Sequence, residues 1–152
     1  MKTQKLFIIL LSFIMVSFMS SCTKDAVEVI VDTSLPQGTF TSAKSGSIVE
    51  QNGTASKGAV TLGTDAKGTQ FVKFGSDFST VLATGTVTVY LSTSDMFKAS
   101  PSTGNPDLRL IGQVSKNGEQ YFKLDPKADA KFSHIILWCG TAAIPFGHSK
   151  LN

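Results

Sequence analysis

Two cysteines carry the most distinctive chemistry in this sequence. Cys22 ends the stretch Met19-Ser20-Ser21-Cys22, and Cys139 ends the apolar run Ile135-Ile136-Leu137-Trp138. A cysteine thiolate is a nucleophile and a metal ligand. Each cysteine is therefore a candidate for covalent modification, and Cys139 is also a candidate for redox or ligand chemistry.

The residues before Cys22 have the three regions of a secretory signal. Lys2 and Lys5 give a positive start, and Leu6–Met19 is an apolar stretch of 14 residues followed by two serines. A transmembrane helix needs roughly 20 such residues. We therefore predict a signal peptide over residues 1–21.

The cysteine indicates which signal peptidase acts. Met19-Ser20-Ser21-Cys22 resembles a lipobox, whose cysteine takes a diacylglycerol and becomes the mature N-terminus, although Met19 stands where leucine is usual. Ordinary cleavage before an unmodified Cys22 is the alternative. Lipidation of Cys22 predicts an extracytoplasmic protein anchored to a bacterial membrane, and we expect the outer membrane.

The rest of the chain divides into a tether and one domain. Residues 22–36 contain the lipidated cysteine, a short apolar run over Val27–Val31 and the turn residues that follow it. Residues 37–152 are long enough for one domain with a single core. Without Lys2 and Lys5 the mature chain has 12 basic and 11 acidic residues, so its charge predicts no nucleic-acid partner.

Short runs rich in Val, Ile, Thr and Phe alternate with Gly, Asn, Asp and Ser after residue 37, and helical periodicity is absent. This pattern predicts an all-β fold, an antiparallel β-sandwich of about eight or nine short strands. The predicted strands are Gly38–Ser42, Ser45–Gln51, Gly58–Gly63, Thr69–Phe74, Thr86–Leu91, Leu108–Ser115, Gln120–Leu124, Phe132–Cys139 and Ala143–Leu151.

Three features refine this prediction. Thr86–Leu91 alternates apolar and polar residues, whereas Phe132–Cys139 is apolar on both faces and is expected at the centre of a sheet. Asn117-Gly118 predicts a two-residue hairpin. The long loop over Ser92–Pro106 is a candidate binding loop, because loops of this length are often functional.

The C-terminal third has a recognisable order of motifs. Gly118-Glu119-Gln120-Tyr121 is followed by Ile136-Leu137-Trp138-Cys139 and then by Pro145-Phe146-Gly147-His148. This order resembles the DM-thirteen domain family, a group of extracytoplasmic β-rich domains predicted to act in electron transfer, and the resemblance covers about residues 37–152. It implies a redox role for Cys139. Small residues follow Cys139 where that family often has an aromatic residue.

The chemistry of Cys139 leaves two interpretations open. If the thiol of Cys22 carries the lipid, Cys139 has no intramolecular disulfide partner in an oxidising compartment. It is then either a buried small hydrophobe beside Ile135 and Leu137 or a redox-active thiol or cofactor ligand. No basic residue lies within seven positions of Cys139 to stabilise a thiolate.

Haem and copper are the cofactors to consider at Cys139. The Cys-x-x-Cys-His motif of c-type haem is absent, which leaves thiolate ligation of a b-type haem. Blue copper needs one cysteine, two histidines and usually a methionine, and the candidates are His134, His148 and Met96. His134 and Cys139 are expected on opposite strand faces. A hairpin at residues 140–142 would place His148 opposite His134.

No catalytic triad, carboxylate pair or phosphate loop is present, so we do not expect an enzyme with turnover of its own. Two functions remain. The first is an accessory electron-transfer protein that uses Cys139 with a redox partner. The second is a non-catalytic surface or periplasmic binding module, which presents the Ser92–Pro106 loop to a protein or glycan and keeps Cys139 as a buried structural residue.

Overall fold

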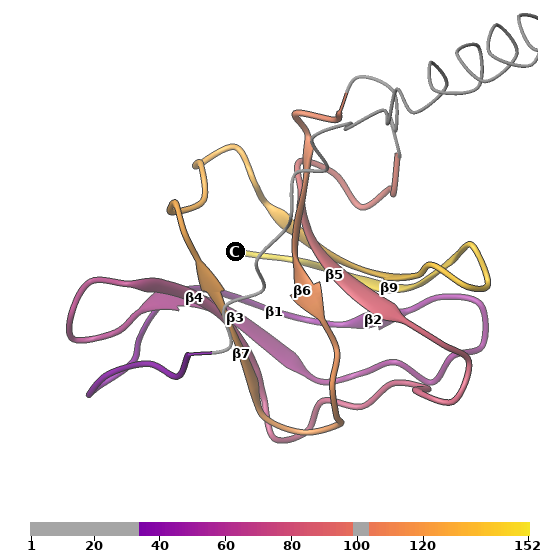
Figure 1. The fold of residues 1–152 in the computed structure, drawn as a ribbon, viewed down its shortest axis with the longest axis horizontal. Coiled ribbons are helices and arrows are strands. Elements are labelled where there is room, and N and C mark those ends of the chain that lie inside the picture. Colours follow the sequence, from indigo (N-terminus) through magenta and orange to yellow (C-terminus); the bar gives the residue numbers. More distant parts are fainter. Residues whose placement is uncertain (1–33, 99–103) are drawn as a thin grey trace, which may run out of the picture.

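The computed structural model describes residues 34–98 and 104–152. The predicted signal peptide, Cys22 and most of the tether lie outside the described residues. The described part of the chain forms nine strands in two antiparallel sheets that pack as a β-sandwich (Figure 1), so the predicted all-β fold is confirmed. Residues 34–98 and 104–152 include no helix long and apolar enough to cross a membrane.

The two sheets draw on strands from all along the chain. The four-stranded sheet has the order β1 (Thr41–Ser47), β3 (Ala59–Thr64), β4 (Gln70–Phe74), β7 (Gln120–Leu124). The five-stranded sheet has the order β2 (Val49–Glu50), β9 (Ile144–Lys150), β8 (His134–Cys139), β5 (Val87–Ser92), β6 (Leu108–Gln113).

The core lies between the sheets and follows from the alternation of side chains along the strands. In β5, Val87, Val89 and Leu91 are fully buried, as the sequence predicts, while Thr88 and Tyr90 face outward and are half-buried. The expected position of β8 is also confirmed, because it is the middle strand of the five-stranded sheet.

The chain passes between the sheets at both sides of the sandwich, and two local predictions are wrong for that reason. Residues 38–51 contain two strands, as predicted, but with different bounds: β1 continues through a bulge near Lys44, and the break lies at Ile48, where the chain changes sheet. There the Ile48 N–H donates to the Gly58 carbonyl oxygen at 2.9 Å. Asn117-Gly118 closes no two-residue hairpin, because β6 and β7 belong to different sheets.

The side of the sandwich formed by β1 and β9 is closed tightly. The backbones of Ser45 and Asn152 exchange two hydrogen bonds of 3.0 Å each. Next to them, a Cβ atom on Gly46 would lie 2.0 Å from the Lys150 carbonyl oxygen and 2.4 Å from Ser149 Oγ. Only glycine permits this approach of the two strands.

Candidate binding face

Cys139 ends β8 on its inner face and is 0% exposed. It pairs with Val87 on β5 and Ile144 on β9, and it belongs to the apolar core. The Ala142 N–H donates to Sγ at 3.4 Å, and Sγ lies 4.0 Å from the Thr84 carbonyl oxygen. Protein atoms therefore surround the thiol, and these contacts leave no space beside Sγ for a haem group.

The two histidines lie on the opposite, outer face of the same sheet. His148 stands opposite Ile136, two residues from the predicted position opposite His134. The turn before β9 is one residue longer than predicted, because Cys139 pairs with Ile144, and a bulge between Leu137 and Trp138 shifts the register by one more residue. His134 stands opposite Lys150 instead. The expectation that His134 and Cys139 occupy opposite faces is confirmed.

The copper ligands considered above are not brought together. Across the two described ranges, no group of three His, Cys, Asp or Glu side chains could hold a metal ion. The remaining candidate, Met96, is 60% exposed on the loop after β5. The positions of these residues do not fit a blue-copper centre.

His134 sits in a partly buried environment with charged groups of both signs nearby. Its Nδ1 lies 2.9 Å from Ser133 Oγ. Burial lowers the pKa of His134 below its usual value of 6.5; the Asp95 carboxylate opposes this shift, and His148 and Lys150 add to it. Burial therefore favours the uncharged form of this imidazole.

An aromatic cluster covers the outer face of β5 and β8. Ile136 points outward yet is 0% exposed. Phe97 lies beside this position: its ring stacks on Trp138 at 3.9 Å between centroids and meets Tyr90, the cross-strand neighbour of Ile136, edge-on at 5.1 Å. Such pairs contribute about 0.5–1.5 kcal/mol beyond the area they bury. Residues 93–98, the described part of the loop that directly follows β5, are thus folded back onto the sheet.

Hydrogen bonds from backbone and side-chain groups hold both ends of this loop. Thr93 N–H donates to the Asp107 carbonyl oxygen at 3.1 Å, and Ser94 N–H donates to Ser92 Oγ at 3.1 Å. On the far side of the loop, the Asn105 side-chain amide donates to the Lys98 carbonyl oxygen. These hydrogen bonds therefore fix the conformation of residues 92–98 on the surface of the sheet.

Two adjacent hollows flank the exposed side chain of Met96. The first, of about 200 Å³, lies beside the aromatic stack and is lined by Gln51, Asp95, Met96, Phe97, Trp138 and Pro145. The second, also about 200 Å³, is mostly polar, and its lining includes Ser92, Ser94, Met96, Lys98, Asn105 and Asp107. We call the surface around both hollows the outer binding face.

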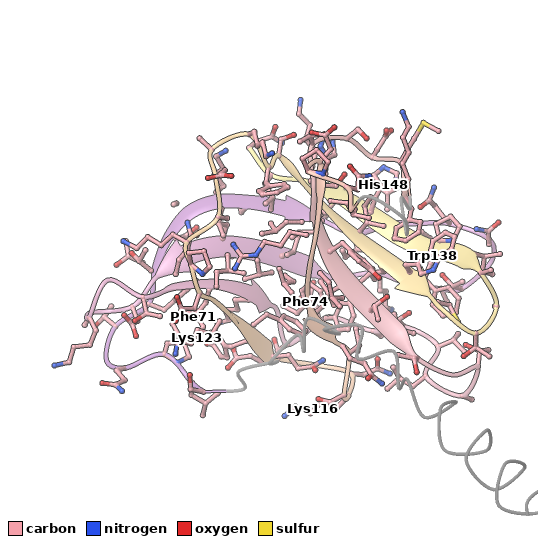
Figure 2. All side chains as sticks on the ribbon, turned by 45° about the horizontal axis from the view of Figure 1, so that its top comes forward. Phe71, Phe74, Lys116, Lys123, Trp138 and His148 are labelled. Atoms are coloured by element: carbon pink, nitrogen blue, oxygen red, sulfur yellow. The ribbon has the colours of Figure 1, made fainter. Side chains whose placement is uncertain are left out.

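Two buried polar atoms at this face have no hydrogen-bond partner among the described residues: Gln51 Oε1 and His148 Nδ1. Gln51 follows β2 and lines the first hollow. His148 faces Val49 of β2 and Ile136 of β8 across the sheet. Figure 2 shows His148 and Trp138 on the C-terminal strands, apart from Phe74 inside the sandwich. Unpaired buried acceptors are rare, and each requires an explanation.

No family model, curated protein or solved structure matches this chain. The resemblance to the DM-thirteen family therefore stays a prediction based on the motifs quoted above.

Sequence reasoning identified the loop as a candidate binding element but did not identify Trp138 as a site residue, and it missed Gln51, Asp95, Phe97 and Pro145 as its neighbours. One signal was present. Met96-Phe97 is an apolar pair inside a loop otherwise rich in Ser, Thr, Asp and Pro. Such a pair is expected to pack against an apolar surface rather than to face water.

Proposed function

We propose that this protein is a lipid-anchored extracytoplasmic binding module. In this proposal the lipid on Cys22 holds the domain to a bacterial membrane, and the outer binding face recognises a partner molecule. Cys139 is then a structural residue of the core. The proposal takes up the second of the two functions that the sequence left open.

One observation carries the proposal. A loop with a large apolar residue is folded onto an outer sheet face, where it forms two hollows with exposed Met96 between them. Small-ligand sites are typically concave and combine apolar walls with a few placed polar groups. Gln51 and Asp95, which line the first hollow, are such groups.

The surroundings of Cys139 favour this function over electron transfer. A thiol that exchanges electrons or ligates a metal has to be reachable by its partner and is usually stabilised as a thiolate by a nearby positive charge. Cys139 is 0% exposed and packs among the apolar core residues of both sheets. A single wholly buried cysteine of this kind behaves as a small hydrophobe.

Hydrogen exchange tests the binding function directly. The full-length protein is held in nonionic detergent and mixed with a soluble extract of the envelope of cells that produce it. We expect slower amide exchange at residues 92–98 and 134–138, with β3 and β4 unchanged. Slower exchange confined to another surface, or no change anywhere, would contradict the proposal.

A pair of matched variants makes the test specific. Met96→Glu places a charge between the two hollows and should abolish the protection, because Met96 is 60% exposed and its replacement leaves the core intact. Leu35→Glu is the control, since Leu35 is 69% exposed and lines a separate hollow of about 410 Å³ near β7. Loss of binding in the control alone would move the binding site to that second surface.

Thiol labelling distinguishes the two functions. In the full-length protein, Cys139 should react with a thiol reagent only after denaturation, and the protein should show no visible absorption. Labelling of the folded protein, or a visible absorption band that Cys139→Ser removes while the fold persists, would instead support electron transfer. Peptide mapping separates Cys139 from any unlipidated Cys22.

A further inference from the structure

The first hollow of the outer binding face has a defined chemical character. Four of its lining residues are apolar or aromatic: Met96, Phe97, Trp138 and Pro145. The other two, Gln51 and Asp95, present oxygen atoms that accept hydrogen bonds. A ligand that fits this lining combines apolar surface with hydrogen-bond donors.

The size of the hollow limits the ligand further. Its volume of about 200 Å³ is below the roughly 300–1,000 Å³ of pockets that enclose drug-sized molecules. It therefore accommodates one small ring or one side chain at a time. Because the second hollow adjoins it at Met96, a longer ligand can place successive units in both.

An organic cation is disfavoured by the geometry of the rings. A cation binds to the face of an aromatic ring. The facing sides of Phe97 and Trp138 are closed to it, because the rings are stacked 3.9 Å apart at an interplanar angle of 12°. Lys98 lines the neighbouring hollow, and Lys150 lies on β9 close enough to His134 to affect its pKa. These two ammonium groups oppose the attraction that the Asp95 carboxylate exerts on a cation.

A neutral polyhydroxylated ring satisfies every part of this lining. Its hydroxyl groups donate to the Asp95 carboxylate and, once the Gln51 side chain turns its buried Oε1 toward the hollow, to that amide oxygen, while its C–H surface packs against Met96 and Pro145. The second hollow suits a following ring, since hydroxyl, amide and carboxylate groups of Ser94, Asn105 and Asp107 line it.

We infer that the outer binding face binds a carbohydrate, with one neutral sugar ring in the hollow beside Trp138 and the next ring across Met96. This inference rests on the proposed binding function and names its ligand class. A protein partner at the same face is the alternative that the experiment has to separate.

Trp138 supplies a direct readout, because it is the one tryptophan of the sequence and lines the hollow. The full-length protein in detergent is titrated with trisaccharides of glucose, xylose, mannose and N-acetylglucosamine, and with the polysaccharide fraction of the envelope extract. We expect a saturable change in Trp138 fluorescence with at least one of these probes.

Two variants link the signal to the hollow. Gln51→Leu keeps the side-chain size but removes the acceptor, and Asp95→Asn removes the charge of an exposed residue; each should weaken the binding at least tenfold. Gln113→Leu is the matched control, because Gln113 is an exposed glutamine of β6 next to the separate hollow near β7. Thermal melting of each variant verifies folding. Equal binding by all variants would overturn the inference.

The two envelope fractions separate the outcomes. If only the protein fraction slows hydrogen exchange at residues 92–98, and no saccharide probe changes Trp138 fluorescence, the binding module stands and the carbohydrate inference is wrong. If neither fraction affects the outer binding face, both are wrong. Saturable fluorescence changes with a saccharide, lost in Gln51→Leu, support both.

Discussion

Ile136 and Leu137 are adjacent residues of β8 that are both 0% exposed but face opposite sides of the five-stranded sheet. Leu137 lies in the closed core between the sheets. Ile136 lies on the outer face, beside Tyr90 and Trp138, whose rings contact Phe97 of the loop after β5. Replacing each with alanine therefore compares the two environments within one strand.

The expected free-energy changes follow from this difference. Ile136→Ala removes an ethyl and a methyl group, or about 2.4 kcal/mol at about 0.8 kcal/mol per buried carbon. The loop above Ile136 is exposed at Asp95, Met96 and Lys98 and can settle into the space, so the cavity cost is small. We expect Ile136→Ala to lower the free energy of unfolding by about 2–3 kcal/mol. Leu137→Ala should lower it by about 3–5 kcal/mol, because two packed sheets cannot close around the void.

Urea unfolding of the full-length protein in detergent, followed by circular dichroism, measures both values. A cost below about 1 kcal/mol for Ile136→Ala would refute the burial of this face by the loop. Phe97→Ala adds a second check: if Phe97 covers Ile136, the double variant should be less destabilised than the sum of the single variants, by about 0.5 kcal/mol or more. Strict additivity would contradict the contact.

Three further predictions concern other parts of the molecule. Gly46→Ala should lower the free energy of unfolding by about 1–3 kcal/mol or more through overpacking against β9, whereas Gly140→Ala, with no atom within 4 Å of the added Cβ, should not; urea unfolding compares them. Hydrogen bonds from the backbone N–H groups of Gln37, then Thr69 and Lys67, lower the pKa of Asp65 below 3.8. The stability that this shift contributes is present above the unfolded-state pKa of 3.8 and is lost as the pH falls through the lower folded-state pKa. Melting temperatures between about pH 5 and 2 should therefore depend less on pH in Asp65→Asn than in the native protein. Cys22→Ser should leave an unacylated precursor that is not retained in membranes, which mass spectrometry and cell fractionation measure.

Each of these has a contradicting result. Equal stability of the two glycine variants would mean that β1 and β9 are not closely apposed. If the melting temperature of Asp65→Asn depends on pH as strongly as that of the native protein, the hydrogen bonds to the Asp65 carboxylate do not contribute to stability. Normal membrane retention and an unchanged mature mass in Cys22→Ser would overturn the lipid anchor.

Local patterns predicted most of the fold. The alternation of Val87, Val89 and Leu91 and the continuous apolar run of β8 are properties of single strands, and both were predicted correctly. The errors arise where distant segments meet. The change of sheet at Ile48 depends on β3 and β9, and the position of His148 depends on a bulge in the pairing of β8 with β9.

The candidate site shows the same division between local and distant information. The loop after β5 stands out in the sequence by its length and composition, and Trp138 by its place in an apolar strand. Their contact through Phe97 joins residues about forty positions apart, and Gln51 comes from a third segment. No local sequence pattern predicts that these three segments are in contact, because the contact depends on the order of the strands in the sheet.

The order of strands in the five-stranded sheet has a consequence for how the chain reaches its native state. β2, near the start of the domain, pairs with β9, and β5 pairs with β8 across the residues of β6 and β7. Native pairings between distant segments form slowly, on a scale of about milliseconds to seconds for sandwiches, because loop-closure entropy is lost before the contacts form. While β9 is unpaired, β2 and β8 each present an open edge, and such edges template aggregation. Folding without aggregation therefore depends on rapid pairing of β9, and conditions that crowd unfolded copies together should reduce the yield of folded protein.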